Sequence, residues 1–241
     1  MDLSHINYSD NVLSPKELKQ LQKYIMDNLD TRGKENGNGM YKLKNGKGFP
    51  LYNFLPKDKE PSNFLEKLIT KLIGQEKHIE YWIRYNDIPL WHIDSDEVIE
   101  RTTTNPFLSE TKEFPTQSYV FYVHILNVTG GDLQILPFNK YEEGRPTLDD
   151  NYEPKKGDKI ITVKPKTNYL VTWKGNLYHR VTEQYSGERL CLVWSLWDKI
   201  PRGFKENLHW APSELIPWSD PAYRRGMLIK PIKWPIKEDQ I

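Results

Sequence analysis

Cysteine and long apolar runs are nearly absent from the sequence. The chain has one cysteine, Cys191, so no disulfide bond can form within it. No apolar run reaches the ~18 residues that a transmembrane helix requires, and none resembles a signal peptide. We therefore expect a soluble cytoplasmic protein in which Cys191 is a buried thiol of the core.

An excess of charge of either sign is absent too. The chain has 34 lysines and arginines and 33 aspartates and glutamates, which leaves a net charge of +1 over 241 residues. This balance gives no overall field that would attract nucleic acid or a membrane surface, and we expect neither as a partner. The length suits one domain rather than two. We expect the protein to be a monomer or a homodimer.

Two amphipathic helices are predicted in the N-terminal third. The first is expected to begin at Pro15, because Ser14 is a suitable N-cap and Glu17 completes a capping box. A second apolar stripe predicts a helix from Ser62 to Ile73. The same region is expected to hold a short edge strand over residues 4–9 and a glycine-rich loop with a small hairpin over residues 30–48.

From position 78 onward, apolar runs of strand length predict a sheet structure. Eight strands are expected, the number that a double-stranded β-helix, or jelly roll, requires. We expect a single mainly β domain of this type: helical support packed on one sheet over 1–77, the jelly-roll core over 78–198, and a Pro- and Trp-rich extension over 199–241. The predicted strands are His78–Tyr85, Leu90–Asp94, Ser118–Leu126, Asp132–Leu136, Lys159–Val163, Tyr169–Trp173, His179–Glu183 and Arg189–Trp197.

Two long connections interrupt these strands. The stretch 95–117 has no clear periodicity, and loops of this length are usually functional or disordered, so we expect a mobile lid there. The charged, proline-containing stretch 137–157 is expected to be a surface excursion.

A histidine and a carboxylate two residues apart end the second predicted strand. Because successive side chains of a strand alternate faces, His92 and Asp94 point the same way and can supply two metal ligands. His179 is the candidate for a third, which would complete the 2-His-1-carboxylate facial triad of non-haem Fe(II) oxygenases. His78 and Glu80 have the same spacing, but no turn or lid follows them, which favours the other pair.

A turn and a cation complete the pattern. A Gly-Gly turn at 130–131 leads into a predicted strand, and Arg189 follows His179 by ten residues. Together with the His92-x-Asp94 pair, these features resemble the Fe(II)/2-oxoglutarate dioxygenases, in particular the prolyl-hydroxylase-like subgroup. The resemblance runs from about Tyr81 to Trp197.

The resemblance implies a cofactor and a set of site residues. Fe(II) would be held by His92, Asp94 and His179 as catalytic residues, with 2-oxoglutarate and O₂ as cosubstrates and ascorbate as a further candidate. Arg189 would bind the distal carboxylate of 2-oxoglutarate through its planar, bidentate fork. The other residues implied around the cosubstrate are Leu133, Tyr85 and Tyr122, with His124 as an alternative on the same face as Tyr122.

The implied reaction is hydroxylation of an unactivated C–H bond, with release of succinate and CO₂. The substrate would be a peptidyl prolyl or lysyl side chain or a small molecule. A nucleic-acid demethylase of the AlkB type is one alternative, but that group carries a second arginine six residues after the first, where this chain has Ser195. A jelly-roll binding module without catalysis is the other, and formation of succinate would separate the two classes.

Overall fold

The larger of two β-sheets organises the fold. The computed structural model describes residues 5–30, 40–43, 53–94, 113–137, 154 and 157–201. Within these residues, eight antiparallel strands pair in the order β1-β9-β6-β11-β5-β3-β2, with β4 also paired to β5. Their bounds are β1 Ile6–Asp10, β2 Leu29–Asp30, β3 Met40–Leu43, β4 Asn53–Leu55, β5 His78–Tyr85, β6 Gln117–Gly130, β9 Tyr169–Lys174 and β11 Gln184–Trp197.

The smaller sheet packs against one face of the larger sheet. It contains β7 (Leu133–Ile135), β8 (Ile161–Val163) and β10 (His179–Val181), in the order β10-β7-β8. Beyond β10, an isolated antiparallel bridge joins His92 to His179. The segment around His92 therefore occupies the place of a fourth strand in this sheet.

That segment is where one predicted strand was wrong. We expected a strand over Leu90–Asp94, but only His92 takes part in a bridge. Pro89, which has no N–H to donate, precedes it, and its carbonyl accepts a hydrogen bond from the backbone N–H of Val181 (3.0 Å). The chain thus runs beside β10 with a few separate hydrogen bonds in place of a regular ladder.

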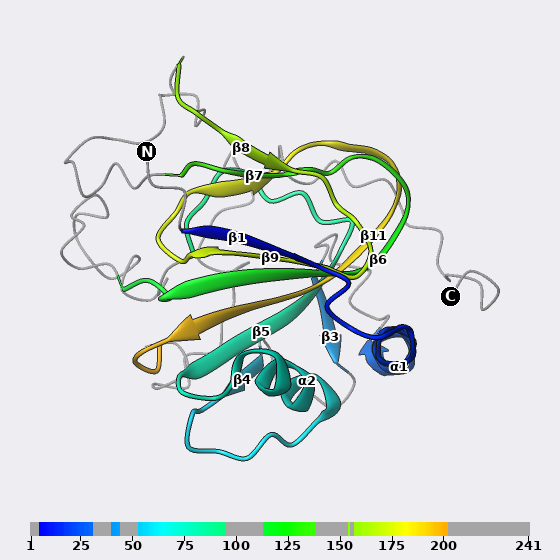
Figure 1. Cartoon of the computed structure of the whole chain (residues 1–241), viewed down its shortest axis with the longest axis vertical. Coiled ribbons are helices and arrows are strands. Elements are labelled where there is room, and N and C mark those ends of the chain that lie inside the picture. The colour runs from blue at the N-terminus through cyan, green and yellow to red at the C-terminus, as the bar shows by residue number, and fades with distance from the viewer. Residues whose placement is uncertain are drawn as a thin grey trace.

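The order in which the chain visits the two sheets is that of a double-stranded β-helix, as predicted. β5 lies in the larger sheet, the His92 segment in the smaller, β6 in the larger, β7 and β8 in the smaller, β9 in the larger, β10 in the smaller and β11 in the larger. Figure 1 shows β7 and β8 above the larger sheet and both helices below it. The fold class, mainly β with helices on one sheet, is confirmed.

Helix α1 (Pro15–Asn28) begins where its capping signal places it, and α2 (Phe64–Ile73) begins two residues after the predicted start at Ser62. The Ser14 hydroxyl accepts a hydrogen bond from the Glu17 N–H (3.3 Å), and the Glu17 carboxylate accepts one from the Ser14 N–H (3.0 Å). In α2 the corresponding pair is Asn63 and Glu66. None of the helices in the described residues is long and apolar enough to cross a membrane.

The larger sheet has a core on each face. On the helix side, Leu21, Ile25, Leu65 and Ile69 pack with alternate residues of the strands, among them Ile83, Phe121 and Trp194. Between the sheets, a second cluster contains Trp82, Val120, Tyr122, Leu133, Cys191 and Val193. We call these the helix-side core and the inner core. Burial on both faces explains why β6 is apolar or aromatic throughout Tyr119–Val123, and Cys191 is buried as expected.

Several expectations for the connecting segments lie wholly or largely outside the described residues. These are the lid over 95–117, the surface excursion over 137–157 and the C-terminal extension over 199–241, of which residues 95–112, 138–153, 155–156 and 202–241 lie outside the described part of the chain. The N-terminal region is more than the helical support that we expected, because β1 to β4 also extend the larger sheet. The predicted edge strand is β1, and the predicted hairpin region contributes β3, which pairs with both β2 and β5.

We predict that α1 is held to the sheet chiefly by its apolar stripe. The Ile25→Ala variant should lower the free energy of unfolding by about 2–5 kcal/mol, because it leaves a cavity in the fully buried helix-side core. Urea titration followed by circular dichroism measures this change. Lys19→Ala, on the exposed face of the same helix, is the control, and a loss for Ile25→Ala no larger than for Lys19→Ala would contradict the packing.

Candidate metal centre

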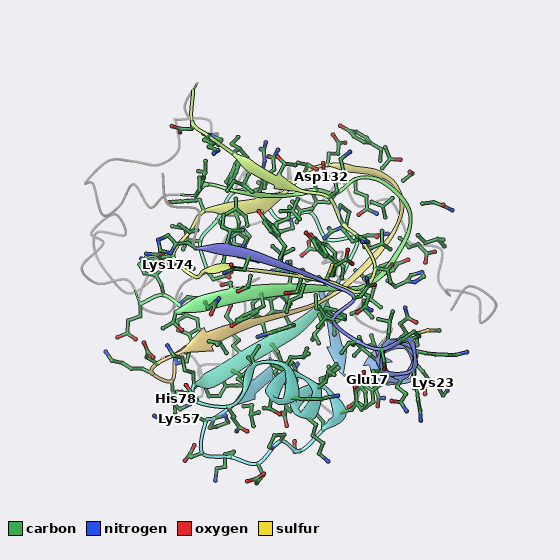
Figure 2. The ribbon with its side chains drawn as sticks, viewed as in Figure 1. Glu17, Lys23, Lys57, His78, Asp132 and Lys174 are labelled. Atoms are coloured by element: carbon green, nitrogen blue, oxygen red, sulfur yellow. The ribbon has the colours of Figure 1, made fainter. Side chains whose placement is uncertain are left out.

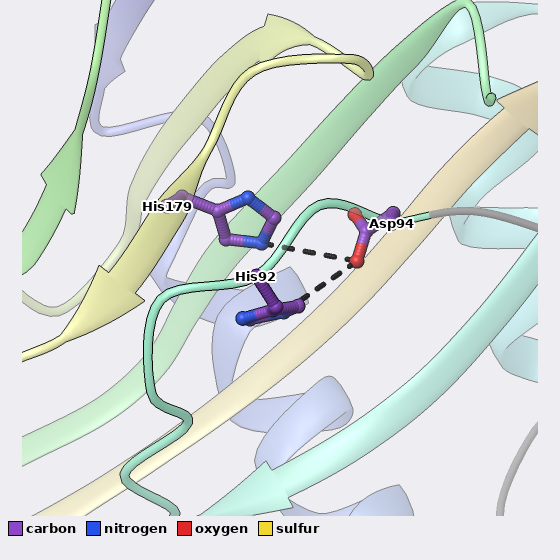
Figure 3. A group of neighbouring side chains, drawn as sticks. All are labelled: His92, Asp94 and His179. Atoms are coloured by element: carbon purple, nitrogen blue, oxygen red, sulfur yellow. Dashed lines mark ion pairs between the residues drawn. The ribbon is translucent and has the colours of Figure 1, made fainter. Parts of the chain in front are cut away.

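The three predicted metal ligands come together at one point. One nitrogen from each histidine and one carboxylate oxygen lie within 4.8 Å of one another. The Nε2 atoms of His92 and His179 are 3.7 and 3.8 Å from the same oxygen, Oδ1 of Asp94, and Figure 3 shows both imidazoles directed at that carboxylate. When metal–ligand bonds are ~2.1 Å long, neighbouring ligand atoms stand ~3 Å apart. The candidate ligand atoms therefore lie farther from one another than they would around a bound ion.

The backbone brings the two histidines together. The N–H of His92 donates to the carbonyl of His179 (3.0 Å), and the N–H of His179 donates to the carbonyl of His92 (2.9 Å). Directly opposed residues of antiparallel segments carry their side chains on the same face. The two rings accordingly lie with their centroids 4.2 Å apart.

Hydrogen bonds at the second ring nitrogens leave the Nε2 atoms available. The Nδ1 of His92 lies 2.7 Å from the carbonyl oxygen of Leu90, and the Nδ1 of His179 lies 3.1 Å from that of Leu177. A carbonyl only accepts hydrogen bonds, so each Nδ1 carries a proton, and in the neutral imidazole this tautomer leaves the lone pair on Nε2. Metal-bound histidines are commonly oriented by such bonds.

The electrostatics favour neutral imidazole and ionised carboxylate. Burial, with a smaller contribution from His92, lowers the pKa of His179 to about 4, so this ring is uncharged at neutral pH. Burial by itself would raise the pKa of Asp94, but His179, His92, a hydrogen bond from Ser118 and the charge of Arg84 together lower it. The donor set of two imidazole nitrogens and one carboxylate is a combination suited to Fe(II).

The alternative pair lies elsewhere. His78 is at the start of β5, where its Nδ1 accepts a hydrogen bond from the backbone N–H of Lys57 (3.2 Å) and its ring stacks on Phe54. Figure 2 shows His78 beside Lys57 at the lower edge of the molecule, far from Asp132 near the smaller sheet. Its neighbours assign His78 to a structural contact between the N-terminal region and β5.

Arg189 is buried on the inner side of the larger sheet. Its side chain donates to Gln184 Oε1 (3.2 Å from Nε) and to the backbone carbonyl of Asp87, and its Nη1 lies 3.8 Å from the sulfur of Cys191. Only 3% of the residue is exposed. Within the part of the chain that the structure describes, no carboxylate forms an ion pair with this guanidinium.

Tyr122 and Leu133 lie in the inner core, on the side of the larger sheet that carries Arg189, and their contact with a cosubstrate stays a prediction. Burial, followed by the neighbouring Cys191, raises the pKa of Tyr122, so its hydroxyl stays protonated. Gly131 is close by: a Cβ there would lie 3.3 Å from Nε of Arg189, and its φ of +69° disfavours any side chain. The Gly-Gly turn therefore gives the arginine its space.

Tyr85, implied beside the cosubstrate, and His124, left open as an alternative to Tyr122, both lie on the helix side of the larger sheet. Tyr85 is part of the helix-side core and hydrogen-bonds Glu188, because it is an odd number of residues from the inward Trp82. For His124 the reason is a β-bulge: β11 pairs Leu190 with His124 but Cys191 with Tyr122, so Val123 is an extra residue. His124 then faces the helices with Leu190, and neither residue belongs to the site.

Sequence reasoning missed a second inward arginine. Arg84 is the cross-strand partner of Cys191, forms an ion pair with Asp87 and contributes to the lowered pKa of Asp94. A signal was available, since Arg84 is two residues from Trp82 on the same strand and so shares its face. Recognising it required knowing which face of β5 points inward.

Comparisons with known proteins gave structural neighbours only. No protein-family model matches the sequence, and no curated protein matches it. The structure is similar to a prolyl-4-hydroxylase from Pseudomonas putida, with a TM-score of 0.44 and 13% identity over 82% of this chain and 95% of that one. It is also similar to the alpha-ketoglutarate-dependent carbocyclase SnoK from nogalamycin biosynthesis (TM-score 0.48, 14% identity, 84% and 86% covered). A third is a viral collagen prolyl hydroxylase from Paramecium Bursaria Chlorella virus-1 (TM-score 0.39, 11% identity, 81% and 90% covered).

Proposed function

We propose that the protein is an Fe(II)- and 2-oxoglutarate-dependent oxygenase that hydroxylates an unactivated C–H bond. The observation that carries this proposal is the triad of His92, Asp94 and His179, with the Nε2 atoms of both histidines 3.7 and 3.8 Å from one carboxylate oxygen. Such a triad holds Fe(II) by one face and leaves its other positions open.

Arg189 supports 2-oxoglutarate as the second component. A buried cation that faces only neutral partners is costly, because the dipoles of an amide and a carbonyl replace its hydration only in part. A carboxylate arriving between the sheets would supply the missing charge and accept two parallel hydrogen bonds from the guanidinium. A dicarboxylate whose other end reaches the metal meets both requirements, and 2-oxoglutarate is such a molecule.

The remaining inner residues would shape the site rather than react. Leu133 and Tyr122 give the cosubstrate an apolar wall, and their burial keeps water from competing for the arginine. His92 is the most accessible of the three ligands among the described residues, with 33% of its side chain exposed against 8% for His179. We infer that the substrate approaches from the side of His92.

When bound, Fe(II) and 2-oxoglutarate would supply the oxidising chemistry, which converts 2-oxoglutarate and O₂ to succinate and CO₂ and inserts a hydroxyl group into the substrate. The protein's part is to orient the components and to hold Asp94 ionised and His179 neutral. A peptidyl prolyl or lysyl side chain and a small molecule both remain candidate substrates. The AlkB-type alternative gains no support, because Ser195 is buried and bonded to Ser118.

Formation of succinate tests the proposal against a binding module. Purified protein with Fe(II), ascorbate, O₂ and 2-oxoglutarate should release succinate even without a known substrate, at the slow rate of uncoupled turnover. Mass spectrometry of the mixture measures it, with boiled protein as the blank. If the protein binds Fe(II) and 2-oxoglutarate yet releases no succinate with any peptide or metabolite extract, the binding module becomes the better description.

We predict that His179→Ala abolishes stoichiometric binding of Fe(II), because two ligands on one segment cannot hold the ion by a full face. Anaerobic equilibrium dialysis with iron analysis measures the occupancy. His78→Ala is the matched control, since His78 lies outside the candidate site, and it should bind one equivalent. Full occupancy in His179→Ala would remove His179 from the site.

We predict that Arg189→Met weakens binding of 2-oxoglutarate by one to several powers of ten. Methionine keeps the apolar stem but removes charge-assisted hydrogen bonds of a kind worth ~1.5–3 kcal/mol each, at ~1.4 kcal/mol for each factor of ten. Titration of 2-oxoglutarate into anaerobic Fe(II)-loaded protein, followed by metal-to-ligand absorption, measures the affinity.

Arg180→Met is the control for this measurement. Arg180 follows His179 directly, but its guanidinium lies over Trp91 (4.8 Å) and hydrogen-bonds Gln134, so its loss should leave the affinity for 2-oxoglutarate unchanged. Equal affinities for Arg189→Met and the unmodified protein would refute the cosubstrate assignment.

A further inference from the structure

We propose that two buried serines, Ser118 and Ser195, form a positioning pair that fixes the carboxylate of Asp94 for metal binding. The inference rests on the metal site of the proposed function and goes beyond its three ligands. It starts from a difference among them: the histidines are tied to each other by backbone hydrogen bonds, whereas Asp94 lies just past the bridge and belongs to no strand. Its carboxylate needs another means of orientation.

Ser118 supplies it from the larger sheet. The hydroxyl of Ser118, at the start of β6, donates to Oδ2 of Asp94 at 2.8 Å. The other oxygen, Oδ1, is the one that both histidines approach. The hydrogen bond thus gives the two carboxylate oxygens different roles, and leaves Oδ1 for the metal.

Ser195 continues the chain of hydrogen bonds. It is the cross-strand partner of Ser118 in β11, and the two hydroxyl oxygens are 3.2 Å apart. A serine hydroxyl has one proton, and Ser118 uses its own toward Asp94, so Ser195 must be the donor to Ser118. A hydroxyl that accepts one hydrogen bond becomes a better donor of its own, so the second serine strengthens the first bond.

The setting of the pair indicates that it serves a purpose other than packing. Both serines have 0% exposure, and they interrupt two strands in which the neighbouring positions are mostly aromatic or aliphatic. Burying a hydroxyl in such surroundings is unfavourable unless it is hydrogen-bonded, and alanine would fill nearly the same volume. Placing two hydroxyls opposite each other, with a carboxylate at the end, makes a support for Asp94.

The decisive measurement is the affinity for Mn(II), a redox-stable stand-in for Fe(II), by isothermal titration calorimetry. Loss of a group that orients a metal ligand typically weakens binding about 10- to 100-fold, and we expect a loss of this size for Ser118→Ala. Ser195→Ala should weaken binding by a smaller factor, because it removes only the strengthening bond. Ser118→Thr, which keeps the hydroxyl, should restore most of the affinity.

The matched control is Thr116→Val. The hydroxyl of Thr116, two residues before Ser118, donates to the backbone carbonyl of Leu196 (3.2 Å) rather than to Asp94. Its removal should leave the affinity for Mn(II) unchanged. Thermal melting of each metal-free variant identifies a loss of affinity that comes from unfolding, and if Ser118→Ala fails to fold, the comparison of Ser195→Ala with Thr116→Val decides.

Two outcomes would overturn the inference. One is a folded Ser118→Ala variant that binds Mn(II) as tightly as the unmodified protein. The other is an equal loss in Ser118→Ala and Ser118→Thr, which would point to packing rather than to the hydroxyl. Absence of Mn(II) binding in the unmodified protein is a different result, because it would remove the metal site and the proposed function with it.

Discussion

The two reciprocal hydrogen bonds between the backbones of His92 and His179 are the constraint on which the candidate site depends. They turn an irregular segment into a partner of β10 and set two imidazoles side by side. They also bring Asp94 to the inner face of the larger sheet, where Ser118 can reach it. The site is therefore formed at the junction of the two sheets, with the backbones of the two histidines on the smaller sheet and the support for the Asp94 carboxylate on the larger one.

The inner core combines apolar packing with charged groups that are unevenly balanced. The carboxylate of Asp94 accepts a hydrogen bond from Ser118 and lies near the positive charge of Arg84. Arg84 also forms an ion pair with Asp87. The charge of Arg189 meets only an amide, a carbonyl and a thiol among the described residues. This imbalance makes the interior receptive to an anion, whereas the helix-side core, closed by Leu21, Ile25 and Leu65, serves stability.

Much of the architecture follows from local sequence, and the exceptions have identifiable causes. Strands such as β5 and β6 and the start of α1 were predictable, because their apolar runs and capping residues act within a few positions. The triad was predictable from the spacing of His92 and Asp94 together with the family resemblance, which singled out His179 through the arginine ten residues after it. The irregular backbone of Leu90–Asp94 was not predictable, because Pro89 prevents a regular ladder and the bridge to His179 is a tertiary contact.

Within the site, it was harder to predict which face of the larger sheet each side chain occupies. The inward direction of β5 depends on which side the helices cover, so Tyr85 was assigned to the site and Arg84 overlooked. The bulge at Val123 reverses the alternation of β6 and moves His124 to the helix side. No local sequence motif predicts this bulge. Ser118 and Ser195 carry no sequence signal either, since their pairing is set by the register between β6 and β11.

The bridge between His92 and His179 also fixes when, during synthesis, the metal centre can first exist. A ribosome that has completed β5 and the His92 segment has produced two of the three ligands, but the strand that holds them in place, β10, is still to be made. The support from Ser195 comes later still, near the end of β11. Contacts between segments that are distant in the sequence cannot form until both segments have been synthesised, and closing the chain between them costs entropy. In the proposed function, iron uptake would therefore await completion of β10, because a nascent or truncated chain that ends before β10 presents a histidine and an aspartate without the third ligand that fixes their geometry.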